Sequence, residues 1–117
     1  MSGFYYLATP YTKYPGGTEA AFTMACQQAA LLLRAGIIVY SPIAHMHSVA
    51  VRGGMDTSYA TPWLDFDAPL MDAAKGIIVC RMAGWKASLG VMHERETFQA
   101  AGKPIVYMEP GVVPVMP

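Results

Sequence analysis

Glu94 is the residue whose type and position in the sequence most clearly indicate chemistry. Residues 88–101 predict a helix, and four residues at spacings of three and four share one of its faces: Val91, Glu94, Phe98 and Ala101. Because the other three are apolar, we expect this face to pack on a sheet and to carry Glu94 into the apolar stripe. Burying a carboxylate without partners is costly. We therefore expect Glu94 either to act on a ligand or to form a structural ion pair with Arg81 or Arg95.

The elements that would position this carboxylate alternate along the chain. Apolar runs predict strands at residues 4–8, 37–40, 76–80 and 105–108. Between them the sequence predicts a helix capped by Thr18 and ended by Gly36, a short helix at 44–51, a helix from 61 to 74 interrupted or restarted at Pro69, and the helix at 88–101.

Near-continuous apolar strands separated by helices indicate a mostly parallel sheet covered on both faces. We predict a small doubly wound α/β fold, of flavodoxin-like or Rossmann-like type, with about five strands. Residues 1–117 make one domain, and residues 109–117, which hold three prolines, make an extended tail.

In such sheets ligands bind beyond the carboxyl ends of the strands. This rule brings four loops together: residues 8–11, 41–47, 81–88 and 108–111. Ser88 and the Gly90 backbone would then lie at a helix N-terminus, where free N–H groups and the helix dipole favour an anion. The alternative is that Ser88 only caps the helix, and one residue can do both.

The composition limits the partners of the chain. Charged residues make up 14% of the 117 residues, with eight basic and eight acidic side chains, against roughly 25% in average domains. We expect an apolar surface, including Met46, Trp85 and the Val-rich tail, to be covered in a homodimer or homotetramer. No basic excess is present to grip nucleic acid. The sequence shows neither a signal peptide nor an apolar run of about 18 residues, so we expect no membrane partner. Cys26 and Cys80 both lie in apolar segments, which suits free thiols in a reducing, cytoplasmic setting.

Several segments together resemble a known family. The segment Ser88–Glu94, Ser-Leu-Gly-Val-Met-His-Glu, followed by Gly102–Pro104, resembles the signature of the nucleoside 2-deoxyribosyltransferase superfamily, which includes the deoxynucleoside 5′-monophosphate N-glycosidases. Tyr6–Pro10 resembles its first strand and loop, and Trp63–Asp67 its acidic helix. The Gly-Trp-x-x-Ser-x-Gly form at Gly84–Gly90 is closest to small bacterial and phage members. The resemblance implies a strand order of about 2-1-3-4-5.

The resemblance also implies roles for individual residues. Glu94 matches the nucleophile that attacks the anomeric carbon, and Asp67 matches the acid that protonates the departing base. Ser88 matches a phosphate or sugar contact, and Tyr6 and Thr9 match the sugar and phosphate contacts of the first loop. The implied ligand is a small-molecule nucleoside or nucleotide, and neither a cofactor nor a metal is expected.

Other readings of these residues remain open. Asp67 could instead cap a helix that begins at residues 68–69, because proline is favoured in a first turn. His45 and His47 could bind a metal, although two histidines without a third patterned ligand are a weak indication of a metal site. Alternatively, His45 could lie at the rim of the pocket. Trp85 could stack on a base or sugar, or cover a subunit interface.

Three hypotheses of function follow. The first is an enzyme that hydrolyses or transfers an N-glycosidic bond with Glu94 as nucleophile. The second is a non-catalytic nucleotide-binding module, which Met92 in the turn and the Thr-Pro-Tyr of residues 9–11 favour. The third is a metal hydrolase built on His45 and His47.

Overall fold

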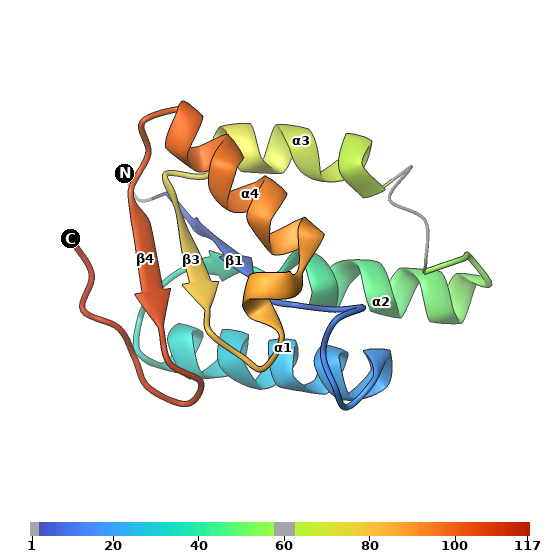
Figure 1. Ribbon diagram of the computed structural model, residues 1–117. Coiled ribbons are helices and arrows are strands. Elements are labelled where there is room, and N and C mark those ends of the chain that lie inside the picture. The colour runs from blue at the N-terminus through green and yellow to red at the C-terminus, as the bar shows by residue number, and fades with distance from the viewer. Residues whose placement is uncertain (1–2, 58–62) are drawn as a thin grey trace.

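A parallel β-sheet between two layers of helices forms the protein (Figure 1). The computed structural model describes residues 3–57 and 63–117. The elements follow in the order β1 (Tyr5–Ala8), α1 (Thr18–Arg34), β2 (Val39–Tyr40), α2 (Pro42–Gly53), α3 (Trp63–Ala73), β3 (Gly76–Cys80), the 3-10 helix η1 (Trp85–Ala87), α4 (Leu89–Ala100) and β4 (Ile105–Met108). The strand order is β2-β1-β3-β4 and every pairing is parallel. The predicted doubly wound α/β fold is confirmed, with four strands in the described residues where about five were expected.

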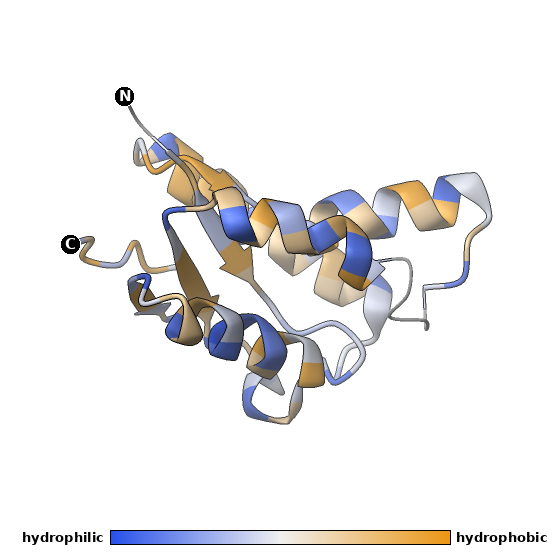
Figure 2. Ribbon diagram, turned by 90° about the horizontal axis from the view of Figure 1, so that it is seen from above, coloured by the Kyte–Doolittle hydropathy of each residue, from blue (hydrophilic) through white to orange (hydrophobic). Residues whose placement is uncertain are grey.

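Helices cover both faces of the sheet because the strands are apolar on both sides. The cluster on the α1 face contains Tyr5, Leu7, Leu32, Ile78 and Cys80. The cluster on the α3 and α4 face contains Tyr6, Ala8, Met71, Ile77, Val91 and Phe98. Figure 2 shows the strands as mainly hydrophobic, whereas the helices carry both hydrophobic and hydrophilic residues. The sheet is therefore a rigid support for groups at its carboxyl edge.

Helix α2 is longer than the predicted segment 44–51. The Ser41 side chain accepts a hydrogen bond from the backbone N of Ala44 at 3.1 Å, so Ser41 is the N-cap. The helix ends at Gly53, and its C-cap is Gly54, whose φ of 73° is left-handed. Helix α2 contributes Met46 to a third cluster, and Met46 is 7% exposed, so its predicted place on an apolar surface was wrong.

Other element ends differ by a residue or two. Gly17, and not Thr18, is the N-cap of α1, without a side-chain hydrogen bond. The strand predicted at 37–40 is reduced to Val39–Tyr40. Ala101 follows the last residue of α4 and is exposed, so the packed face of α4 ends at Phe98.

Helix α3 runs through Pro69 without a restart. Its predicted beginning at residues 61–62 lies outside the described residues. Pro69 has no N–H to donate to the preceding turn. At the other end of the helix the Lys103 ammonium donates to three main-chain carbonyl oxygens, those of Met71 at 3.1 Å, Asp72 at 2.5 Å and Ala74 at 2.7 Å. Lys103 thus satisfies two free carbonyls of the last turn of α3 and that of the residue after it.

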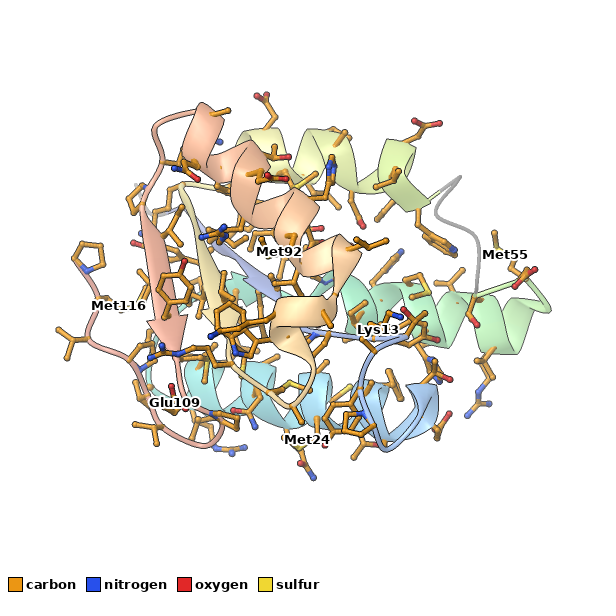
Figure 3. The ribbon with its side chains drawn as sticks, viewed as in Figure 1. Lys13, Met24, Met55, Met92, Glu109 and Met116 are labelled. Atoms are coloured by element: carbon orange, nitrogen blue, oxygen red, sulfur yellow. The ribbon has the colours of Figure 1, made fainter. Side chains whose placement is uncertain are left out.

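The tail begins with a turn and then has no regular secondary structure. The backbone N–H of Gly111 donates to Oε1 of Gln28 at 2.8 Å, which ties the turn to α1. Met116 packs against the cluster on the α1 face, beside β4 (Figure 3). Val115 is 94% exposed. Within the described residues, no helix is both long and apolar enough to span a bilayer.

Candidate active site

A cavity of about 280 Å³ lies beyond the carboxyl ends of β1 and β3. Its walls come from the loop after β1 (Thr9, Tyr11, Thr12), from α2 (Pro42, Ile43, Met46), from Thr57, from α3 (Trp63, Leu64, Asp67, Met71) and from the start of α4 (Ser88, Leu89, Gly90, His93, Glu94). The walls are mainly apolar with a few polar groups, as in small-molecule sites. The sheet thus brings together side chains that lie far apart in the sequence.

Glu94 reaches this cavity from the sheet-facing side of α4, as the helical spacing predicted. The Tyr6 hydroxyl donates a hydrogen bond to its Oε2 at 2.7 Å. Arg81 pairs instead with Glu109, and Arg95 donates to the Tyr107 hydroxyl. The structure therefore does not form the ion pairs considered as a structural role for Glu94.

Tyr6 contacts Glu94 through this hydrogen bond but is not among the residues that line the cavity. Its side chain is fully buried between Tyr40 and Phe98, with ring centroids 5.9 and 5.7 Å away. Burial, and next the negative charge of Glu94, raise the pKa of Tyr6. The hydroxyl therefore remains a neutral donor that fixes the position of the carboxylate.

Asp67 is the second carboxylate of the cavity and comes from the middle of α3. It is the fifth residue of that helix, so the alternative of an N-cap at Asp67 is wrong. Burial raises the pKa of Asp67 to about 6, against the opposite effects of the Tyr6 hydroxyl and of charge on His45. Burial and the nearby charge of Asp67 raise the pKa of Glu94 to about 8, while the Tyr6 hydrogen bond acts in the other direction.

The two carboxyl groups interact and therefore titrate as a pair. Between about pH 6 and about pH 8 the pair holds one proton. Over this range the proton lies on Glu94 and the negative charge on Asp67, so the pair supplies one proton donor and one anionic group at neutral pH. This arrangement suits general acid and nucleophilic chemistry.

A polar region of the cavity lies at the N-terminus of α4. Ser88 is the N-cap and accepts a hydrogen bond from the backbone N of Val91 at 3.2 Å. Ser88 and Gly90 both line the cavity, so the predicted cap and the predicted pocket position are combined in one residue. Thr9 is 3% exposed, and its Oγ1 has no hydrogen-bond partner within the described part of the chain. A buried hydroxyl of this kind calls for a polar partner.

Comparison with known families adds one result. The family model described as "Domain of unknown function (DUF1937)" matches residues 3–110. The chain belongs to the DUF1937 family. A search of curated proteins gave no match. Family membership therefore assigns the domain, and the chemistry has to be argued from the site.

Besides Tyr6, two more of the predicted ligand contacts of this DUF1937 domain, Trp85 and His45, lie away from the cavity walls. The Trp85 ring lies 5.9 Å from that of Tyr107 and packs on the α4 side of the sheet. The His45 ring is stacked on Phe66 at 4.8 Å and is exposed. His45 still acts on the site through its electrostatic effect on Asp67.

His45 and His47 have separate surroundings in this DUF1937 domain. His47 is buried and hydrogen-bonded to Tyr11 and Glu19. In residues 3–57 and 63–117, no three His, Cys, Asp or Glu side chains are grouped closely enough to hold a metal ion. The two histidines are thus engaged with different protein groups.

The sequence analysis missed several cavity residues of the DUF1937 domain. Tyr11 belongs to residues 8–11, a loop that the strand-end rule placed at the site, but it was not singled out as a contact. His93 precedes Glu94 and lines the same wall. Trp63 and Leu64 belong to the segment that carried the resemblance, but only their contact with the cavity reveals an apolar wall.

Proposed function

We propose that this DUF1937 domain cleaves or transfers the N-glycosidic bond of a nucleoside or nucleotide. The observation that carries the proposal is that Glu94 and Asp67 line one cavity from two different helices, with raised pKa values. Paired carboxyl groups with separated pKa values are typical of retaining glycosidases. The likeness of Ser88–Glu94 to the deoxyribosyltransferase signature supports a nucleoside substrate.

In the first step the Glu94 carboxylate attacks C1′ of the sugar. The bond between C1′ and the base nitrogen breaks, its electron pair goes to the base, and Asp67 gives its proton to the base. The products are a glycosyl ester on Glu94 and a neutral free base. Protonation makes the base a better leaving group.

In the second step an acceptor, either water or another base, attacks C1′ of the glycosyl ester. The C1′–oxygen bond to Glu94 breaks and its electron pair restores the carboxylate. The acceptor gives up one proton, which passes to solvent, as its new bond to C1′ forms. Asp67 takes one proton back from solvent, which restores the starting state of the pair. Water gives hydrolysis and a second base gives transfer.

The first step needs the proton of the carboxyl pair on Asp67, whereas in the empty cavity the pKa values place it on Glu94. The reactive form has a charged Glu94 and a protonated Asp67. The Tyr6 hydrogen bond favours charge on Glu94, and positive charge developing on the sugar ring in the transition state favours it further. The substrate thus selects the reactive arrangement of the single proton.

Base release measures this activity directly. We would incubate the wild-type protein with nucleosides and 2′-deoxynucleoside 5′-monophosphates and quantify free base by liquid chromatography. Glu94→Gln keeps the size of the side chain and is expected to abolish release. Glu96→Gln, which changes an exposed residue of the same helix, is the matched control and is expected to retain it. Full activity of Glu94→Gln on a substrate that the wild type cleaves would refute the role of Glu94.

A non-catalytic nucleotide-binding function is the second candidate. The observation that favours it is the raised pKa of Glu94, about 8, which leaves this carboxyl mainly neutral at pH 7 in the empty cavity. A binding module would be stabilised thermally by nucleotides in both wild type and Glu94→Gln. It would release no base from any of them.

A further inference from the structure

Three side chains outside the carboxyl pair form a continuous hydrogen-bonded chain that ends at the cavity. The Tyr11 hydroxyl lies 2.6 Å from Nδ1 of His47, and Nε2 of His47 lies 2.8 Å from Oε2 of Glu19. Tyr11 lines the cavity. The Glu19 side chain is 78% exposed, whereas that of His47 is 5% exposed. The chain therefore connects solvent with the wall of the site.

The chemistry of the three groups fixes the direction of both hydrogen bonds in the neutral state. An ionised Glu19 only accepts, so Nε2 of His47 must carry the hydrogen. A neutral imidazole then has a bare Nδ1, which accepts the hydrogen of the Tyr11 hydroxyl. The His47 ring has little freedom to leave this arrangement, because it is stacked on Phe22 with centroids 4.4 Å apart.

This order of groups is the one that activates a hydroxyl. A base at hydrogen-bond distance from a hydroxyl, itself oriented by a carboxylate, is the general arrangement for removing the hydroxyl proton. Both distances fall in the range that such proton transfer requires. Neither Glu94 nor Asp67 takes part in either hydrogen bond.

We propose that Glu19 and His47 form a proton relay that makes the Tyr11 hydroxyl a general base toward the cavity. Within the proposed function, on which this particular role rests, Tyr11 deprotonates the acceptor in the second step. The acceptor proton passes to the Tyr11 oxygen as the Tyr11 proton passes to Nδ1 of His47. The imidazolium is then paired with Glu19 and returns its proton to solvent. Tyr11 touches the acceptor, while His47 and Glu19 act through it as positioning residues.

A sulfonyl fluoride tests the activation of Tyr11 without any nucleoside. With phenylmethanesulfonyl fluoride the Tyr11 oxygen bonds to sulfur, the sulfur–fluorine bond breaks, fluoride leaves and the proton goes to His47. Peptide mapping by mass spectrometry is expected to find Tyr11 labelled faster than the exposed Tyr107. His47→Ala is expected to slow labelling at Tyr11 by at least about a hundredfold without affecting Tyr107.

A second variant, Glu19→Gln, tests the relay even if His47→Ala fails to fold, because the Glu19 side chain is mainly exposed. Its amide can donate to Nε2 and so place the His47 hydrogen on Nδ1, which removes the acceptor for the Tyr11 proton. We expect labelling of Tyr11 to slow at least about tenfold in this variant. Labelling of Tyr11 no faster than that of Tyr107, or unchanged labelling in Glu19→Gln, would overturn the relay.

Pre-steady-state kinetics separate the relay from the proposed function. On a deoxynucleoside monophosphate that the wild type cleaves, Glu19→Gln is expected to keep the initial burst of base release and to slow steady-state turnover. The glycosyl ester then accumulates on the protein. A burst and a steady-state rate that fall together would refute the role of Tyr11 in the second step. Absence of all cleavage would refute the proposed function, while the labelling rates would still decide the relay.

Discussion

Glu94→Gln is expected to make the protein more stable at neutral and alkaline pH. Burial raises the pKa of Glu94 from 4.5 to about 8, so the folded state favours the protonated form. The folded protein therefore binds more protons than the unfolded chain between these two pH values. By linkage, the free energy of unfolding falls as the pH rises from about 4.5 to about 8. A glutamine is neutral throughout and keeps an oxygen that accepts from Tyr6.

The size of this effect follows from the two pKa values. One pKa unit corresponds to about 1.36 kcal/mol, so the difference between 4.5 and about 8 sets an upper limit of about 5 kcal/mol above pH 8. Glu94 is only half-buried as a whole residue, and partial exposure to solvent reduces the penalty. We expect a gain of about 2 kcal/mol at pH 8, equivalent to about 8 °C in Tm for a domain of this size.

Chemical denaturation at several pH values between 4.5 and 8.5 measures the effect. The difference in unfolding free energy between Glu94→Gln and wild type is expected to grow with pH, since the wild type alone pays the cost of ionisation. Glu96→Gln on the exposed side of α4 is the control and should follow the wild-type curve. Parallel curves for wild type and Glu94→Gln, or a less stable Glu94→Gln at pH 8, would refute the reasoning.

Three further predictions concern other parts of the site and its support. Activity should be bell-shaped in pH, falling below about 6 where the carboxyl pair gains a second proton and above about 8 where it loses both, and a rate that is flat from pH 5 to 9 would contradict the shared proton. Inorganic phosphate should raise the Tm of the wild type but not of Ser88→Asp, in which aspartate still caps α4 and repels the anion, whereas equal shifts would exclude an anion site there. Lys103→Met should lower the free energy of unfolding by about 2 kcal/mol, because three carbonyl oxygens at the end of α3 lose a charged donor, and urea denaturation showing no loss would contradict this capping role.

The central strand β3 could be predicted residue by residue because burial on both faces leaves a strong signal. The run at 76–80 is apolar throughout, and β3 has the predicted bounds. The bounds of β4 were also predicted correctly at 105–108, although β4 is an edge strand and its Tyr107 is exposed. The edge strand β2 is different. Ile38 was placed in it, but Ile38 is 52% exposed and only its carbonyl contacts β1, accepting from the backbone N of Tyr5. Hydrophobicity alone does not distinguish an edge residue from a central one.

The helix predicted at 44–51 was shorter than α2 because the beginning of α2 coincides with the end of a strand. Ser41-Pro42 is typical both of the end of a strand and of an N-cap followed by proline in the first turn, and the structure uses it for both. The third cluster includes Met46 and Ala50 of α2. It depends on how separate segments pack together, which the residue periodicity of a single segment does not predict.

The candidate site, too, could be predicted from the sequence only in part. The place of Glu94 on the packed face of α4 followed from helical spacing, and that of Asp67 from the resemblance alone. The bond from Tyr6 to Glu94 joins residues 88 positions apart, and the link from Tyr11 through His47 to Glu19 joins three separate segments. Such contacts depend on the distances between packed elements, which only the folded structure supplies.

The most direct test of the account is the detection of a covalent sugar on Glu94. A 2′-fluoro arabino-nucleoside forms the glycosyl ester and then slows its release, because fluorine destabilises the positively charged transition state of the second step. Intact-protein mass spectrometry is expected to show the addition of one fluorinated sugar, and peptide mapping to place it on Glu94, with no addition in Glu94→Gln and normal addition in Glu96→Gln. An adduct on another residue, or release of the base by the wild type without any adduct, would contradict the assignment of Glu94 as the nucleophile.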